Sequence, residues 1–154
     1  MKSIPNLEST LAGVAGEYYV AAELTLRGYI ASITLRNSRG VDIIASNSEA
    51  SKSVSIQVKT SNSSKPKWIL SQKNENFASD SENHFYVFVA LHQLTERPDF
   101  YVVPSKIVAE SIRSSHANWL SGKKKDDTQR KDSSIRNFTD DEGKYKEAWD
   151  LLNL

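Results

Sequence analysis

The sequence predicts an α/β (α+β) fold in which helices flank a central mixed β-sheet. Three observations lead to it. A helical pattern opens the chain, short runs of strand-like residues fill its middle, and helical patterns return after Pro104. Helices on either side of a block of strands can cover both faces of one sheet.

The first helix is predicted over residues 8–27, where apolar residues recur at spacings of three and four. Gly28 is a natural C-terminal stop. Glu17 falls among small and apolar residues of the same helical face, such as Val14 and Val20. This carboxylate is therefore either a solvated group at the edge of the buried stripe or a group that faces a site.

Strands are predicted at six places: 29–36, 41–45, 53–59, 67–70, 84–91 and 100–103. The clearest alternation is the third, where Val54, Ile56 and Val58 alternate with polar residues. The fifth is continuously apolar, which is typical of a strand buried on both faces. A turn at 37–40 precedes the second strand.

Two further helices are predicted, at 106–116 with Ser105 as its N-cap, and at 141–152. Residues 121–134 between them form a charged loop. No linker or repeat divides the chain. We therefore predict a single domain over residues 1–154, with a core at about 8–116 and a helical tail at 117–154.

Composition excludes several classes of site. The chain has no cysteine, which rules out disulfides and thiolate metal ligands. His84, His92 and His116 do not have the spacing of a zinc site. No apolar run approaches the roughly 18 residues of a membrane span, and the first residues lack the apolar stretch of a secretory signal. We expect a cytoplasmic protein that does not enter a membrane.

The net charge is only +1, but it is unevenly distributed. Residues 59–73 hold four lysines and no acid, and basic residues are again in excess at 101–138. Two such patches can bind a polyanion if they converge in space. For the run at 123–131, a solvated surface is the plainer interpretation.

Polar residues interrupt two of the predicted strands. Asp42 lies between Val41 and Ile43, where burial is expected, and a buried acid needs a hydrogen bond, a cation or a metal. Gln57 and Lys59 stand side by side on the polar face of the next long strand. Solvent exposure would also explain that polar face. Together, however, these groups could present a divalent metal and a cation to a phosphodiester.

Three short motifs follow one another along the chain: Gly16-Glu17 in a helix, Gly40-Val41-Asp42 at a strand, and Gln57-Val58-Lys59 in the next strand. In order and context they resemble the three-part active site of the PD-(D/E)XK nuclease superfamily. That superfamily has the restriction-endonuclease-like fold and includes archaeal Holliday junction resolvases and small restriction-type nucleases. The motifs cover about residues 11–60, the element order to about 116 is compatible, and the tail matches nothing specific.

The resemblance implies a Mg²⁺- or Mn²⁺-dependent DNA endonuclease. Asp42 would anchor the metal, and the Gln57 side-chain oxygen and the Val58 main-chain carbonyl would complete the inner shell. Glu17 would hold a water of the ion or a second ion. Lys59 would lie beside the attacking water and stabilise charge on the phosphate.

The sequence departs from the family pattern at two positions. Val41 stands in place of a proline, and Gln57 in place of the usual acid. An amide oxygen can bind a hard cation, but it brings no charge. A catalytically weak or inactive nucleic-acid- or protein-binding module on the same fold is therefore the alternative. A third interpretation is an unrelated domain in which Asp42 and Lys59 form a buried ion pair.

DNA is the expected partner, and a homodimer would suit the cutting of two strands. Basic residues that could follow the DNA backbone are Arg39, Lys65, Lys67, Lys73, Lys123, Lys124, Lys125, Arg130 and Arg136.

Overall fold

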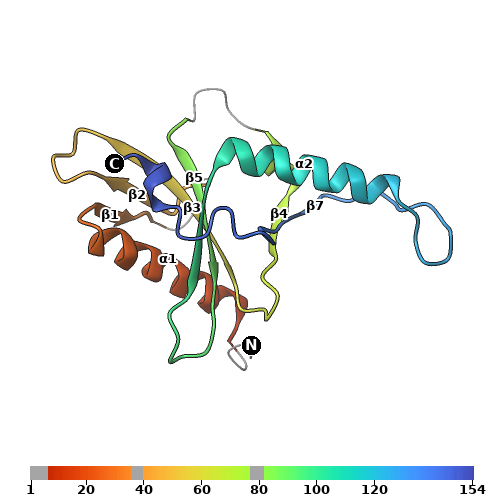
Figure 1. Ribbon diagram of the computed structural model, residues 1–154, viewed down its shortest axis with the longest axis horizontal. Helices are drawn as coiled ribbons and strands as arrows, with labels where there is room; N and C mark the ends of the chain where they lie inside the picture. The colour runs from red at the N-terminus through yellow and green to blue at the C-terminus, as the bar shows by residue number, and fades with distance from the viewer. Residues whose placement is uncertain (1–6, 36–39, 77–81) are drawn as a thin grey trace.

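The computed structural model describes residues 7–35, 40–76 and 82–154 (Figure 1). In chain order its elements are α1 (Ser9–Leu26), β1 (Ile30–Ile33), β2 (Ile43–Ser46), β3 (Ser53–Ser61), β4 (Trp68–Ser71), the 3₁₀ turn η1 (Gln72–Glu75), β5 (His84–Ala90), β6 (Asp99–Pro104), α2 (Ser105–Ser121), β7 (Ile135–Phe138) and the 3₁₀ turn η2 (Trp149–Leu152).

The central sheet has five strands in the order β1-β2-β3-β5-β6. β3 and β5 run parallel, and the other neighbours are antiparallel. The crossover between the parallel strands contains β4 and η1, and β4 pairs with β7 in a second, two-stranded sheet. The predicted mixed sheet is confirmed.

The two helices lie on opposite sides of this sheet (Figure 1). Val20 and Leu24 of α1 belong to the same buried cluster as Ile56 of β3. Val108 and Ile112 of α2 belong to a second cluster with Trp68 and residues of β5. β5 supplies side chains to both clusters, which is why its sequence is continuously apolar. Neither α1 nor α2 is long and apolar enough to cross a membrane.

The start of α2 differs from the prediction. The helix begins at Ser105 itself, and Pro104 occupies the cap position without a side-chain cap bond. The Ser105 hydroxyl is buried and has no hydrogen-bond partner within the described ranges, so the predicted N-cap is wrong. α2 also runs on to Ser121, past the edge of the sheet, and forms an arm that projects from the body (Figure 1).

The predicted helix at 141–152 is also wrong, except for the short turn η2. The segment makes turn bonds within itself, such as Lys146 N–H to the Gly143 carbonyl, and it also bonds to the edge strand β6. The Val102 N–H donates to the Tyr145 carbonyl at 3.0 Å, and the Glu147 N–H donates to the Phe100 carbonyl at 2.8 Å. Covering an otherwise open sheet edge outweighs the local helical pattern. Trp149 and other apolar residues of the segment still reach the α1-side core, as their spacing suggested.

Candidate functional site

Asp42, Gln57 and Lys59 come together where β2 and β3 separate. Asp42 is the residue before β2, and the β2–β3 register pairs Ile43 with Ile56. One step further along this register places Asp42 opposite Gln57. Lys59 lies two residues beyond Gln57 on β3 and so points to the same face. All three side chains are half-buried.

The Asp42 carboxylate accepts the hydrogen bond that a backbone carbonyl of a neighbouring strand would otherwise accept from the Val58 N–H. Its Oδ2 accepts a hydrogen bond from the Val58 N–H at 2.7 Å, and its own N–H donates to the Ile56 carbonyl at 2.8 Å. Beyond this point β2 no longer pairs with β3. The side chain therefore satisfies a strand N–H that would otherwise have no partner.

The Val58 carbonyl lies on the same open side of β3. The Ser55 N–H and the Ser61 carbonyl bond toward β5, at 2.9 and 2.8 Å. Backbone groups alternate in direction along a strand. Val58 is three residues from both Ser55 and Ser61, which is an odd number, so its N–H and carbonyl point away from β5. The carbonyl of Val58 thus faces the side on which the Asp42 carboxylate lies.

The Gln57 amide oxygen also lies toward the Asp42 segment. A Cβ atom built on Gly40 would be 3.8 Å from Gln57 Oε1, which is ordinary van der Waals contact. Gly40 has φ +65°, a left-handed conformation that glycine adopts without strain. The turn before Asp42 is therefore both close to Gln57 and shaped for a residue without a side chain.

The charge of Asp42 acts on two residues of the neighbouring strand β5, His84 and Tyr86. Burial lowers the pKa of His84, and the negative charge of Asp42 partly opposes that shift. Burial also raises the pKa of Tyr86; a hydrogen bond from Asn74 opposes this shift, and the charge of Asp42 adds to it. Tyr86 is opposite Gln57 in the β3–β5 register and belongs to the α2-side cluster. Asp42, Gln57 and Lys59 therefore do not point to opposite faces of the sheet.

Asp42 and Lys59 are not an ion pair. None of the ion pairs found in residues 7–35, 40–76 and 82–154 contains either residue. The interpretation of these groups as a buried salt bridge is therefore wrong. We call Asp42, Gln57, Val58 and Lys59 the Asp42 site.

Glu17 lies on α1, which packs on the other face of the sheet from Gln57 and Lys59. It is half-buried in α1 and follows Gly16, which packs directly on Thr60 of β3. Glu23 lies six residues further along α1, about a third of a turn around the helix from Glu17. Glu23 faces Arg97, so Glu17 projects to a different side of α1.

Within the described ranges, no three His, Cys, Asp or Glu side chains gather into a metal site. A metal at the Asp42 site would therefore depend on the amide oxygen of Gln57 and the carbonyl of Val58 as well as on Asp42.

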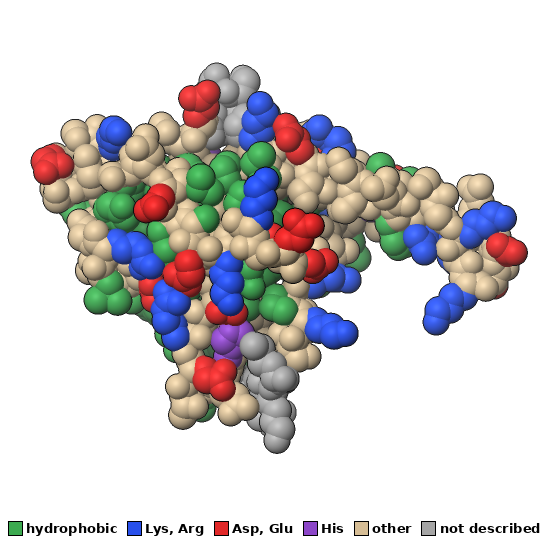
Figure 2. All heavy atoms as spheres, viewed as in Figure 1, with side chains coloured by type: hydrophobic (Ala, Val, Ile, Leu, Met, Phe, Trp, Pro, Cys, Tyr) green, Lys and Arg blue, Asp and Glu red, His purple; other side chains and the backbone are tan. Residues whose placement is uncertain are grey.

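The predicted DNA-contacting residues fall into separate groups. Lys65, Lys67 and Lys73 are exposed in or near the crossover after β3. The loop that holds Lys123, Lys124 and Lys125 is at the far end of the arm, and basic side chains stand at its tip (Figure 2).

Two other predicted DNA-contacting residues, Arg136 and Arg130, contact other side chains of the protein. Arg136 is 3% exposed on β7, where Nε donates to Glu75 and Nη1 to the Ser133 carbonyl at 2.7 Å. It is therefore unavailable to DNA, and that prediction is wrong. Arg130 lies over the Trp119 ring, 5.1 Å from its centroid. Arg39 lies outside the described residues.

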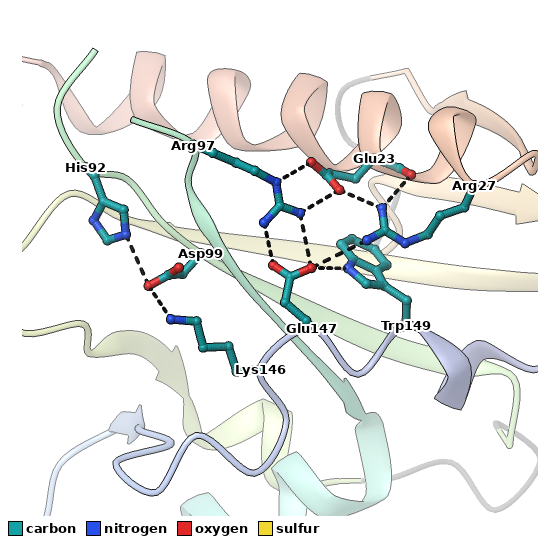
Figure 3. A network of polar contacts seen from close by, with 8 residues as sticks. All are labelled: Glu23, Arg27, His92, Arg97, Asp99, Lys146, Glu147 and Trp149. Carbon is teal, nitrogen blue, oxygen red and sulfur yellow. Dashed lines mark hydrogen bonds and ion pairs between the residues drawn. The ribbon is translucent and has the colours of Figure 1, made fainter. Parts of the chain in front are cut away.

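The sequence reasoning missed a charged cluster on the α1 side of the molecule (Figure 3). Arg97 donates to both carboxylate oxygens of Glu23, at 2.9 and 2.7 Å, and to Glu147 at 2.8 Å. Arg27 donates to Glu23 at 2.6 Å, and the Trp149 indole donates to Glu147 at 3.0 Å. We call these five residues the Arg97 cluster. It fastens the C-terminal segment to α1 and to the loop between β5 and β6.

A search of protein-family models and a search of curated proteins found no match. Among solved structures, the bacterial homing endonuclease I-Ssp6803I matches with a TM-score of 0.52 and 17% identity, over 95% of this chain and 92% of that one. The chain has the restriction-endonuclease-like fold. An archaeal Holliday junction resolvase, Hjc of Archaeoglobus fulgidus, matches with a TM-score of 0.46 and 14% identity over 82% of each chain. The match to I-Ssp6803I confirms the sequence resemblance at the level of the fold.

Proposed function

We propose that the chain is a DNA endonuclease that hydrolyses phosphodiester bonds with Mg²⁺ or Mn²⁺. The observation that carries this proposal is the Asp42 site, where the Asp42 carboxylate accepts a bond from the Val58 N–H and the strand register puts Gln57 and Lys59 on the same face. The fold supports it, because a similar solved structure is a homing endonuclease.

The donor set suits a hard divalent cation. Magnesium prefers oxygen ligands and tolerates a small number of protein groups, because it keeps several waters. Asp42 uses Oδ2 for Val58, and within the described part of the chain no bond occupies Oδ1. The Gln57 amide and the Val58 carbonyl add neutral oxygens on the same side. When bound, the ion supplies Lewis-acid stabilisation of charge on the phosphate.

Lys59 and Glu17 complete the proposed chemistry. The Lys59 ammonium has no carboxylate partner in the part of the chain that the structure describes, so its charge is available to a phosphate. In that position it stabilises negative charge in the transition state and favours the deprotonated form of an attacking water. Glu17, carried by α1, would help to order that water or a second ion.

The exposed lysines after β3 are the proposed contacts to the DNA backbone. Lys65, Lys67 and Lys73 follow the strand that bears Gln57 and Lys59. Contacts of this kind make affinity fall as salt rises. Homodimer formation and cytoplasmic location stay predictions.

A cleavage assay tests the proposal. Supercoiled plasmid and a four-way DNA junction are incubated with the protein in Mg²⁺, in Mn²⁺ and in EDTA. We expect cutting with either metal and none in EDTA, and we expect Lys59→Ala to abolish it without lowering the melting temperature. Lys106→Ala, at an exposed position on α2, is the matched control and should cut normally. Retention of DNA in a gel shift without any metal-dependent cutting would support the binding module instead.

A further inference from the structure

α1 lies very close to β3 at Gly16. A Cβ atom built on Gly16 would lie 1.9 Å from Thr60 Oγ1, 3.1 Å from Thr60 Cβ and 3.3 Å from Thr60 Cγ2. Gly13, one turn earlier in the same helix, would meet nothing within 4 Å. Both glycines lower helix stability relative to alanine, but only Gly16 has a neighbour that requires it.

The contact joins the two segments that carry the proposed chemistry. On the helix, the next residue is Glu17. On the strand, Thr60 follows Val58 and Lys59 directly, beyond the point where β2 has ended. The Thr60 hydroxyl is buried and has no hydrogen-bond partner within the described ranges, so hydrogen bonding does not explain its place.

We infer that Gly16 and Thr60 are positioning residues that set the distance between Glu17 and the Asp42 site. This inference rests on the proposed nuclease function. Ordinary van der Waals contact begins at 3.4 Å, so a methyl group at position 16 would be 1.5 Å too close to Thr60 Oγ1, and either the helix or the Thr60 side chain must move. Rotation of Thr60 about χ1 would remove Oγ1 but leave Cβ at 3.1 Å. α1, and Glu17 with it, must therefore move by a few tenths of an ångström if Thr60 rotates and by up to 1.5 Å if it does not.

A displacement of about 1 Å at a catalytic centre can lower a rate roughly 100-fold. We therefore expect Gly16→Ala to cut DNA between roughly 10- and 100-fold more slowly at saturating DNA, and to need more Mn²⁺ for half-maximal rate. Gly13→Ala is the matched control. It makes the same chemical change in the same helix, and we expect it to cut at the wild-type rate.

Thr60→Ala provides the decisive partner variant, because it removes Oγ1 and Cγ2 and leaves a contact that a shift of a few tenths of an ångström relieves. Gly16→Ala combined with Thr60→Ala should recover most of the lost rate. Mn²⁺ affinity, measured by titration calorimetry without DNA, should fall in the single Gly16 variant and recover in the double variant. The melting temperature of each variant shows whether a lower rate comes from repositioning of Glu17 or from loss of the folded structure.

The outcomes are distinct. If the wild-type protein neither cuts DNA nor binds Mn²⁺, the proposed function fails, and the positioning role fails with it. If the wild type is active and Gly16→Ala matches it in rate and in Mn²⁺ affinity, only the positioning role is overturned. Failure of the double variant to recover, while it melts like the wild type, overturns it as well. If Gly16→Ala does not fold, the cleavage rate and Mn²⁺ affinity of the double variant test the positioning role: values near those of the wild type support it, and values well below them in a folded protein overturn it.

Discussion

The Asp42 site and the Arg97 cluster are both polar groups at the boundary of the same core, but they are satisfied to different degrees. In the Arg97 cluster, both carboxylate oxygens of Glu23 accept bonds from guanidinium groups. In the Asp42 site, a carboxylate oxygen, an amide and an ammonium have no partner within the described part of the chain. A structural cluster satisfies its members, whereas groups held close together without satisfying one another mark a place for a ligand.

The largest effect that can test this contrast comes from removing one charge from each region. Asp42→Asn keeps an oxygen that can accept the Val58 N–H but removes the charge that would hold a cation. We expect cleavage to fall roughly 1,000-fold, because metal-ion stabilisation is worth several kcal/mol and each 1.4 kcal/mol is tenfold in rate. The melting temperature should change little. Initial rates of plasmid nicking and thermal unfolding measure the two quantities.

Glu23→Gln is the matched change in the Arg97 cluster. It should lower the melting temperature, because the amide bonds less strongly to Arg97 and Arg27, and it should leave cleavage at 25 °C near the wild-type rate. The contrast between the two regions is wrong if Asp42→Asn destabilises the protein and Glu23→Gln abolishes cutting.

A smaller effect is expected from Gln57→Glu, which restores the acid that the family pattern usually has. A second carboxylate beside Asp42 should attract a divalent ion more strongly, by about 1 to 4 kcal/mol between the limits of full and partial solvent screening, which is tenfold or more in affinity over most of that range. The Mg²⁺ concentration that gives half-maximal cleavage should therefore fall. Gln57→Ala, which removes the oxygen altogether, should raise it. An unchanged Mg²⁺ requirement in both variants would mean that Gln57 is not a ligand.

The parts of this site that sequence could predict are the parts set by local pattern. Alternation over 53–59 put Gln57 and Lys59 on one face, and β-branched neighbours marked Asp42 as a strand-associated acid. The bond between Asp42 and Val58 follows from the way two adjacent strands separate. Sequence reasoning could therefore place these residues near one another because they belong to consecutive strands.

What sequence could not predict depends on partners far along the chain. Arg97 is 74 residues from Glu23 and 50 from Glu147, and no periodicity relates them. The sequence predicts Arg136 to be a basic surface residue. In the structure, β7 pairs with β4, and Arg136 forms an ion pair with Glu75. The segment at 141–148 has a helical pattern, but β6 offers its backbone better partners. In each case a long-range contact outweighs the local signal.

Arg97→Ala should affect stability alone. It leaves Glu147 with fewer partners and Glu23, whose side chain is 12% exposed, with Arg27 only. Arg97 itself is half exposed, so solvent screens part of each ion pair. We expect a loss of about 1–2 kcal/mol in the free energy of unfolding, measured by urea denaturation. Lys52→Ala, at an exposed position just before β3, is the control and should cost much less.

The smallest expected effect is the acid sensitivity of the Arg97 cluster. Hydrogen bonds from Arg97 lower the pKa of Glu23, and those from Arg27 add to the shift while burial opposes it. A carboxyl group whose pKa is lower in the folded state binds a proton more readily when the chain is unfolded. Its contribution to stability is therefore complete above the unfolded pKa of about 4.3 and is lost as pH falls through the lower, folded value.

The free energy of unfolding of the wild-type protein should therefore decrease as pH falls below about 4.3, and part of that decrease should be absent in Arg97→Ala. Urea denaturation between pH 7 and pH 3 measures both slopes. Asp42→Asn supplies the comparison from the other region, because it should leave the contribution of Glu23 intact and keep the steeper slope. If Arg97→Ala loses stability toward low pH as steeply as the wild type, the cluster does not stabilise the folded state through the ionised form of Glu23.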